Sequence, residues 1–187
     1  MANKIRFDRK SIEDAAFAIV QTRGIAALNA RSLAYEINAS TQPIFSNFSS
    51  MEEIKEIVSN RCIEVFRQFS DAGLAEKNPV KGLALAMVKF VNENRYLYQV
   101  LFHGSSNLLK ADIEHFGTVL TSYIAKSFSL PNKVANIVFL ENWLFIVGLS
   151  SQSYSGALQM NEKALSGMLD SILEGTVNSV KARLSKR

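Results

Sequence analysis

Apolar residues recur along most of this chain at the spacing of amphipathic helices. The first such face consists of Ile12, Ala15, Ala16, Ile19 and Val20. Because these positions follow the i, i+3, i+4, i+7 series of one helical face, they predict a helix, and Gly24 provides its C-terminal stop. Alternating runs bounded by turn residues recur nowhere in the sequence, so we expect an all-α protein.

Two short helices are expected next, separated by a turn. Asn29 can cap the first of them, and the side chains expected to face inward are those of Leu33, Ala34 and Ile37. Asn38 stands where a residue in the left-handed conformation would end that helix, and asparagine rivals glycine there. Ser40 can cap the second short helix, with Pro43 in its first turn, where a missing N–H costs nothing.

Longer helices are expected in the rest of the chain. Ser50 and Glu53 match a capping box that opens a fourth helix ending near Gly73. Asn78-Pro79 is typical of the N-cap and first position of a fifth helix, which we expect to reach Phe102. After a loop at residues 103–107, the remaining helices are expected over residues 110–128, 134–152 and 161–183. These segments account for eight helices, and we expect about nine in the whole chain.

Residues 134–149 are apolar enough to suggest a membrane span. The segment is only about 16 residues long and contains two asparagines and a glutamate, so we expect a helix buried in a soluble protein. Residues 1–10 are polar and basic, which predicts no export signal. The single cysteine, Cys62, cannot form an intramolecular disulfide, and its place on an apolar helix face predicts an inert buried thiol in a reducing cytoplasm.

Charge is concentrated at the two ends of the chain. The net charge is +4, with +3 in residues 1–10, +4 in residues 181–187 and therefore −3 between them. A basic N-terminal arm suits contact with phosphate, whereas a basic C-terminal helix end can simply complement the helix dipole. His103 and His115 have no carboxylate or cysteine at metal-ligand or catalytic spacing. No metal, cofactor or catalytic site is expected.

The first helices have the lengths and spacing of a helix-turn-helix on a supporting helix, and their residues resemble a known family. The segments that carry the resemblance are Ile12-Glu13-Asp14-Ala15-Ala16, Gly24, Arg31-Ser32-Leu33-Ala34, Ala39-Ser40, Ile44-Phe45-Ser46-Asn47-Phe48 and Glu52-Glu53-Ile54. In order and register they are similar to the signature of the tetracycline-repressor (TetR) family. A second similarity, to the ligand-binding half of that family, lies in Phe90-Val91-Asn92-Glu93-Asn94, Leu97-Tyr98 and Leu101-Phe102.

The resemblance implies two domains with different tasks. A TetR-type DNA-binding domain is expected over residues 6–66, with the helix-turn-helix at about 29–48, and an effector-binding and dimerisation domain over residues 75–187. The implied protein is a cytoplasmic repressor, not an enzyme, that binds a palindromic operator as a homodimer and is released by a small, largely apolar effector. The alternatives are an effector-independent or activating member of the family, and a helical carrier or enzyme.

The third helix, laid in the major groove, would present its N-terminal side chains to base edges. Gln42 suits adenine, Thr41 offers a hydroxyl, and Pro43 offers an apolar surface to a thymine methyl. The rest of the expected DNA-binding set, which positions the protein mainly through phosphates, is Lys4, Arg6, Arg31, Ser40, Phe45, Asn47, Ser49 and Lys55.

Four positions depart from the residues usual in the family. Asn38 replaces a turn glycine, Phe45 a tyrosine and Asn47 a histidine. Met51 replaces a lysine, whose phosphate contact Lys55 could supply only in part. More of the affinity is therefore expected from the basic arm and Arg31, while the rings of Phe45 and Phe48 are expected mainly to fill the core.

The resemblance further implies an effector cavity among helices four to eight and a dimer interface on the last two helices. Apolar cavities with a few polar groups are typical of such sites. The candidate effector-binding residues are Phe66, Met87, Phe90, Asn94, Tyr98, Phe102, Phe116, Tyr123, Glu141, Asn142 and Trp143. The candidate dimer residues are Val138, Phe145, Leu149, Leu165, Met168, Leu169, Ile172 and Leu173.

Overall fold

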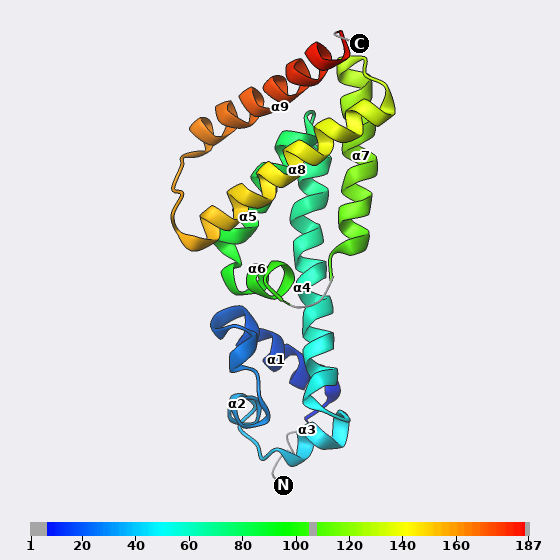
Figure 1. The fold of residues 1–187 in the computed structure, drawn as a ribbon. Helices are drawn as coiled ribbons and strands as arrows, with labels where there is room; N and C mark the ends of the chain where they lie inside the picture. The colour runs from blue at the N-terminus through cyan, green and yellow to red at the C-terminus, as the bar shows by residue number, and fades with distance from the viewer. Residues whose placement is uncertain (1–6, 105–107, 186–187) are drawn as a thin grey trace. The chain divides into compact units, whose positions relative to one another are not determined.

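The computed structural model describes residues 7–104 and 108–185. Every regular element in those ranges is helical (Figure 1). The α-helices are α1 (Arg9–Arg23), α2 (Ala30–Glu36), α3 (Gln42–Asn47), α4 (Met51–Leu74), α5 (Pro79–Glu93), α6 (Arg95–Phe102), α7 (Lys110–Phe128), α8 (Asn132–Ser155) and α9 (Glu162–Leu184), and a 3-10 turn, η1 (Ile25–Ala27), follows α1. The expected all-α fold is confirmed over this part of the chain; residues 105–107 of the expected loop lie outside it.

The chain forms two compact units. The N-terminal unit contains Met1–Val65 together with Asn94–Leu108, and the C-terminal unit contains Phe66–Glu93 and Leu109–Arg187. The first part of α4 therefore belongs to one unit and its last part to the other. The domain limits expected from the sequence stay a prediction; the compact units differ from them chiefly at residues 94–108, which contain α6.

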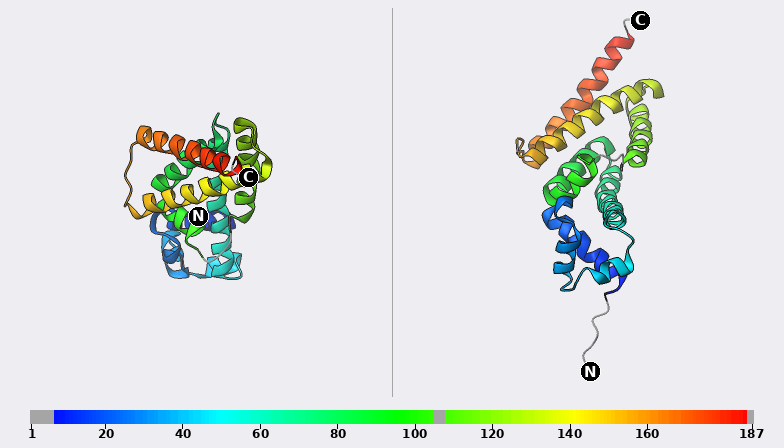
Figure 2. Two further views of the ribbon diagram at one scale, coloured as in Figure 1. Left: turned by 45° about the horizontal axis from the view of Figure 1, so that its top comes forward. Right: turned by 60° about the horizontal axis from the view of Figure 1, so that its bottom comes forward.

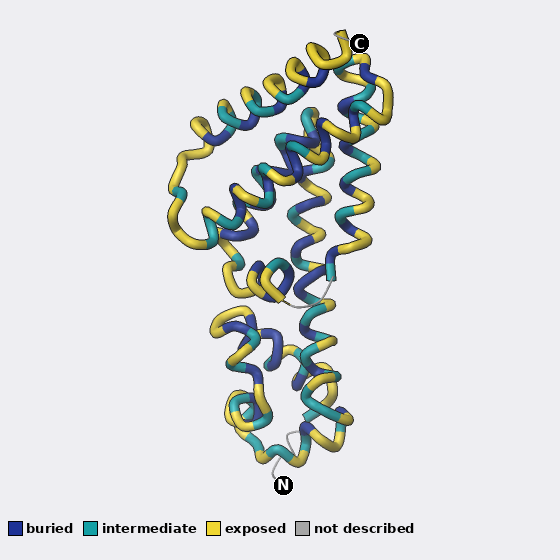
Figure 3. Tube along the Cα trace, viewed as in Figure 1, coloured by how far each residue is buried: buried dark blue, intermediate teal, exposed yellow. Residues whose placement is uncertain are grey.

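In the N-terminal unit, α1 packs against η1, α2 and α6. Four of the five residues expected on its inward face, Ile12, Ala16, Ile19 and Val20, are buried, and Ala15 is half-buried. Figure 3 shows the buried positions in dark blue. Gly24 ends α1 with φ of +83°, a conformation that L side chains rarely adopt. A Cβ there would also lie 3.0 Å from the ring of Tyr96 in α6. Both the backbone conformation and the nearby ring therefore favour glycine at this position.

The expected single helix from Pro79 to Phe102 is wrong, because the chain breaks it at Asn94. The backbone of Asn94 lies outside the helical region, at φ −134° and ψ 50°. Neither proline nor glycine marks the break, and apolar residues such as Phe90 and Leu97 keep their helical spacing across it. Periodicity alone therefore could not separate α5 from α6.

In the C-terminal unit, α8 packs against α5, α7 and α9 (Figure 2). Edge-to-face and tilted ring contacts join four side chains here: Phe66 lies 5.2 Å from Phe90 and 6.2 Å from Phe116, and Phe116 lies 5.9 Å from Trp143, between ring centroids. We call Phe66, Phe90, Phe116 and Trp143 the aromatic cluster. Such geometries add favourable quadrupole contacts to the burial of large apolar surfaces.

A pair of glycines brings α4 and α5 into close contact. A Cβ on Gly82 would lie 2.1 Å from the carbonyl oxygen of Gly73, and a Cβ on Gly73 would lie 2.6 Å from that of Gly82. No side chain fits at either distance, so these glycines are required by packing and not by backbone conformation. A second link in this unit joins Arg67 of α4 to Asp112 in the first turn of α7, with N–O distances of 2.6 and 3.1 Å.

Within the described residues, α8 is the one helix long and apolar enough to cross a membrane. Less than half of its apolar window is buried, 44%, and a core helix of a soluble protein passes the same test. The expectation that this helix is buried is only partly met. Ile137, Leu140 and Leu144 are 45, 47 and 71% exposed, so α8 has one uncovered apolar face.

Candidate DNA-binding site

The N-terminus of α2 is capped as the sequence predicts. The side-chain oxygen of Asn29 accepts hydrogen bonds from the N–H groups of Arg31 and Ser32, both at 3.0 Å. The hydroxyl of Ser32 lies 3.1 Å from the N–H of Asn29, which donates to it and completes a capping box. The cap fixes where α2 begins and places the exposed Arg31 side chain in its first turn.

The turn after α2 depends on a left-handed residue, as expected. Asn38 has φ of +52°, and the N–H of Ala39 donates to the carbonyl of Ala34 at 2.9 Å. The predicted cap of the next helix needs correction, because α3 begins at Gln42 and its N-cap position is Thr41. Ser40 still contributes, since its hydroxyl accepts from the N–H of Gln42 at 3.4 Å.

The exposed side of α3 carries the residues expected to read bases. Gln42 is exposed and Thr41 and Pro43 are partly exposed, while Ile44 and Phe48 point into the core. Phe45 was expected in the core, and that prediction is wrong: its side chain is 51% exposed. Ile44 and Phe48 lie one helical turn apart on the inner face, and Phe45, the residue directly after Ile44, lies on the outer side of α3. The ring of Phe45 is free to contact a partner.

Exposed basic side chains lie close to this helix pair in the sequence. Arg31 is exposed and makes no ion pair with the described part of the chain, and Tyr35, one turn later on α2, is 80% exposed. Sequence reasoning missed Tyr35, which no motif distinguishes. Lys55 is partly exposed and lies 3.7 Å from Glu52. Lys4 and Arg6 lie outside the described residues.

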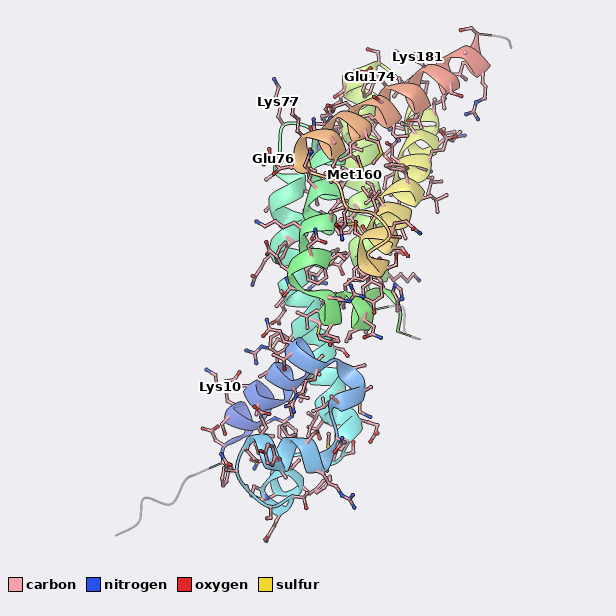
Figure 4. All side chains as sticks on the ribbon, turned by 90° about the vertical axis from the view of Figure 1, so that its left-hand side faces the viewer. Lys10, Glu76, Lys77, Met160, Glu174 and Lys181 are labelled. Carbon is pink, nitrogen blue, oxygen red and sulfur yellow. The ribbon has the colours of Figure 1, made fainter. Side chains whose placement is uncertain are left out.

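Arg9 makes several contacts within the N-terminal unit, and no motif in the sequence distinguishes it from the other basic residues of the arm. Its guanidinium donates to Glu13 at 3.1 Å, to the backbone carbonyl of Asn47 at 2.8 Å and to Glu53 at 2.6 Å. It also lies over the ring of Phe48, 4.3 Å from the centroid. The basic arm of residues 1–10 therefore loses one of its cations to an internal network, whereas Lys10 projects outward (Figure 4).

Two expected phosphate contacts are already engaged within the protein. The amide of Asn47 donates to the carbonyls of Pro43 at 2.8 Å and Phe7 at 3.3 Å. The hydroxyl of Ser49 donates to Glu53 at 2.8 Å. Hydrogen bonds from Arg9 and then from the backbone and hydroxyl of Ser49 lower the pKa of Glu53 to about 2.

The residues expected to bind an effector are divided between the two compact units. Asn94, Tyr98 and Phe102 belong to the N-terminal unit, and Tyr98 and Phe102 stack on each other with centroids 4.6 Å apart. In the C-terminal unit, Met87 is buried on α5, three residues before Phe90 of the aromatic cluster, and Tyr123 is half-buried.

The polar effector candidates on α8 already have partners. The buried amide of Asn142 donates to the carbonyl of Val138 and to the hydroxyl of Thr176, both at 2.9 Å. Glu141 lies 3.2 Å from Arg183 on α9. These two side chains thus tie α8 to α9, a structural role that the sequence did not indicate.

An open cleft of about 860 Å³ lies elsewhere in the C-terminal unit. Its walls come from the end of α4, the outer side of α5 and the start of α9, including Phe69, Leu85 and Leu165. Figure 4 labels Glu76 and Met160, which lie at its rim. No residue predicted to bind an effector lines this cleft, because the resemblance directed attention to the interior of the unit.

The candidate dimer residues are mostly core residues. Val138, Leu149, Leu165, Leu169 and Leu173 are buried within their own unit, which leaves little of them for a second copy to contact. Phe145, Met168 and Ile172 are half-buried. The uncovered apolar face of α8 was missed because an almost uniformly hydrophobic helix does not reveal from its sequence which side points inward.

Cys62 is buried, and burial raises the pKa of its thiol to about 12. A thiol in that state is protonated and unreactive at neutral pH, in agreement with the expected inert cysteine. The described residues contain no cluster of three or more histidine, cysteine or carboxylate side chains that could hold a metal ion.

Comparison with known proteins shows a likeness in structure. No protein-family model matches the chain, and none of the curated proteins matches its sequence. Among solved structures, a TetR variant from Acinetobacter baumannii AYE, crystallised in complex with minocycline, is similar with a TM-score of 0.57 at 16% sequence identity. The likeness covers 92% of this chain and 98% of that chain, so it concerns the whole helical fold.

Proposed function

We propose that this protein is a DNA-binding transcriptional regulator that binds a palindromic operator as a homodimer and is released by a small-molecule effector. The observation that carries the proposal is the α2–turn–α3 arrangement, with a capped α2, a left-handed Asn38 and an α3 whose exposed residues begin at Gln42. Helix-turn-helix proteins lay the second helix of such a pair in the major groove. The likeness of the whole fold to a TetR protein supports this assignment.

The sequence-reading role falls to the first residues of α3. The amide of Gln42 can contact the N6 and N7 atoms of adenine, and Pro43 and the exposed ring of Phe45 offer apolar surface to a thymine methyl. Arg31, on the first turn of α2, has the exposed charge that a phosphate contact requires. DNA binding of this kind weakens steeply with salt because counterions are released.

Selection of bound duplexes from a random pool tests the proposal. We expect the full chain to select a palindrome whose half-sites lie roughly 34–36 Å apart. Gln42→Ala should relax the choice at one base position of each half-site and cost about 1–3 kcal/mol of binding free energy. Gln21→Ala, which removes an exposed glutamine of α1, is the matched control. Failure to bind any duplex selectively would contradict the proposal.

The homodimer is proposed to form on the uncovered apolar face of α8, made by Ile137, Leu140 and Leu144. On α9, an added Cβ at Gly167 or Gly175 meets nothing within 4 Å, so a helix of the second copy can approach closely. Two copies of this chain related by a two-fold axis would cover both apolar faces at once.

Sedimentation measures this assembly directly. We expect wild-type protein to sediment as two copies of the 20.8-kDa chain and Leu144→Glu as one, because a carboxylate cannot be buried unpaired in an apolar interface. Met160→Glu places the same charge at an exposed residue outside α8 and should leave the dimer intact. A Leu144→Glu protein that remains dimeric would exclude this face.

Effector response is the remaining part of the proposal. Trp143 is the only tryptophan of the chain and lies within the aromatic cluster, so its fluorescence reports on that region. Minocycline, which the similar TetR structure binds, is a suitable first probe. Binding should change Trp143 fluorescence and weaken operator affinity, and the operator should weaken probe affinity by the same factor. A ligand that binds tightly without changing operator affinity would favour an effector-independent regulator.

A further inference from the structure

Arg9 joins three helices of the N-terminal unit through one side chain. Arg9 is the first residue of α1, Asn47 is the last residue of α3, and Glu53 lies in the first turn of α4. The guanidinium contacts the carbonyl of Asn47 at 2.8 Å and the carboxylate of Glu53 at 2.6 Å. Because a guanidinium presents its donors in a fixed fork, these contacts set the distance between the end of α3 and the start of α4.

Glu53 holds the connection between α3 and α4 from the other side. Its second carboxylate oxygen accepts from the N–H of Ser49 at 2.7 Å and from the Ser49 hydroxyl at 2.8 Å. The N–H of Glu53 itself donates to Ser50 at 3.2 Å. The reciprocal bond of the expected capping box therefore goes to Ser49 instead of Ser50. The three-residue connection between the helices is fixed by side-chain contacts at every position, since Phe48 carries the guanidinium on its ring.

The recognition helix needs such support. With six residues, α3 is far shorter than a helix that is stable by itself, and the carbonyl of Asn47 at its C-terminal end has no helical partner. Arg9 supplies a charged donor to that carbonyl. Arg9 also forms ion pairs with the carboxylates of Glu13 and Glu53. Because these carboxylates compensate its positive charge, its attraction for a DNA phosphate is weak.

We infer that Arg9 and Glu53 are positioning residues for operator binding: their network fixes the pose of α3 and is not itself a phosphate contact. The inference rests on the proposed DNA-binding function. It predicts that removing the negative charge of Glu53 weakens binding to DNA, although DNA is a polyanion. A purely electrostatic account of that carboxylate predicts tighter binding.

Operator titrations over a range of salt concentrations separate the two accounts. We expect Glu53→Gln and Arg9→Lys to weaken operator binding by roughly tenfold, because neither variant can bridge the two helices, while the salt dependence stays unchanged. Arg31→Ala should instead lower the salt slope by about one unit, as loss of a phosphate contact does. Glu56→Gln, an exposed carboxylate of the same helix without a partner in the described residues, is the matched control for charge.

Amide hydrogen exchange provides a readout that needs no DNA. Exchange over residues 44–49 should become faster in Glu53→Gln and in Arg9→Lys, whereas exchange over Ala30–Glu36 should not change in these variants. The control Glu56→Gln should exchange at the wild-type rate in both segments. If the wild-type protein binds no DNA, the proposed function fails, and exchange alone decides whether the network holds α3. Unchanged exchange in both variants, or operator binding by Glu53→Gln at least as tight as that of the wild type, would overturn the inference.

Discussion

The two compact units are held together by different interactions. In the N-terminal unit, short helices are fixed by polar contacts at helix ends: the capping box of Asn29, the Arg9–Glu53 network, and the hydrogen bond that Arg23 at the end of α1 donates to Glu36 at the end of α2. In the C-terminal unit, long helices meet through the aromatic cluster and the Gly73–Gly82 contact.

Helix length explains much of the difference. α2 and α3 have seven and six residues, while α8 has 24. A short helix leaves most of its N–H and C=O groups without helical partners and buries little surface, so caps and ion pairs decide its position. A long helix can be held by burial along its length, and its surface is then free to vary. Substitutions at both kinds of contact test this contrast.

The largest expected effect is loss of a ring from the aromatic cluster. Phe116 is 1% exposed and contacts both Phe66 and Trp143, so Phe116→Ala should lower the free energy of unfolding by about 3–5 kcal/mol. Chemical denaturation followed by circular dichroism measures the loss. Phe45→Ala, which removes a ring that is 51% exposed on α3, should change stability by less than about 0.5 kcal/mol. If Phe116→Ala and Phe45→Ala lowered the free energy of unfolding by similar amounts, burial of aromatic rings would not explain how the two units differ.

The glycine contact between α4 and α5 should be next in magnitude. Gly82→Ala places a methyl group 2.1 Å from the carbonyl of Gly73, and the helix shift this forces should cost about 1–3 kcal/mol. Gln68→Ala, at an exposed position of α4, is the control and should change stability by less than about 0.5 kcal/mol. A stable Gly82→Ala protein would mean that the two helices are not closely packed.

The same contrast explains what could be predicted from the sequence. Caps and the left-handed turn depend on residues within a few positions of each other, so Asn29 and Asn38 were placed correctly from pattern alone. The fold class and most helices followed from apolar periodicity. The pairing of Arg9 with Glu53 spans 44 residues and had no local signal.

Interior packing was less predictable still. The sequence showed that the last half of the chain is rich in large apolar side chains, but not which rings pack on each other or which face of α8 remains uncovered. Exposure of Phe45 and the break at Asn94 were missed for a related reason. Both depend on neighbouring elements, to which a periodic pattern within one helix is insensitive.

A smaller loss is expected from the cap of α2. Asn29→Ala removes the acceptor for the N–H groups of Arg31 and Ser32 and should cost about 1 kcal/mol. Asn29→Asp keeps an oxygen at the same place and should retain most of the stability. Thermal unfolding of the three proteins at one pH gives the comparison. If Asn29→Ala unfolded at the same temperature as the wild type, the polar caps would not be what stabilises the short helices.

The smallest expected effect is a stabilisation by Glu53 that acid removes. Hydrogen bonds from Arg9 and Ser49 keep the pKa of Glu53 at about 2, against an ordinary value of 4.5. A carboxyl whose pKa is lower in the folded protein stabilises the fold fully above its unfolded pKa and loses that contribution as the pH falls toward the folded pKa. The contribution of Glu53 should therefore be intact at pH 6 and decline between about pH 4.5 and 2.

Glu53→Gln tests this dependence, because glutamine cannot titrate. The variant should be less stable than the wild type at pH 6, and the difference between the two should narrow as the pH falls below 4.5. Glu56→Gln, on the exposed side of the same helix, should show no such convergence. A stability difference that stays constant down to pH 2 would mean that the Arg9–Glu53 pair is not what stabilises the start of α4. The helix caps would then be the polar contacts that hold the short helices of the N-terminal unit.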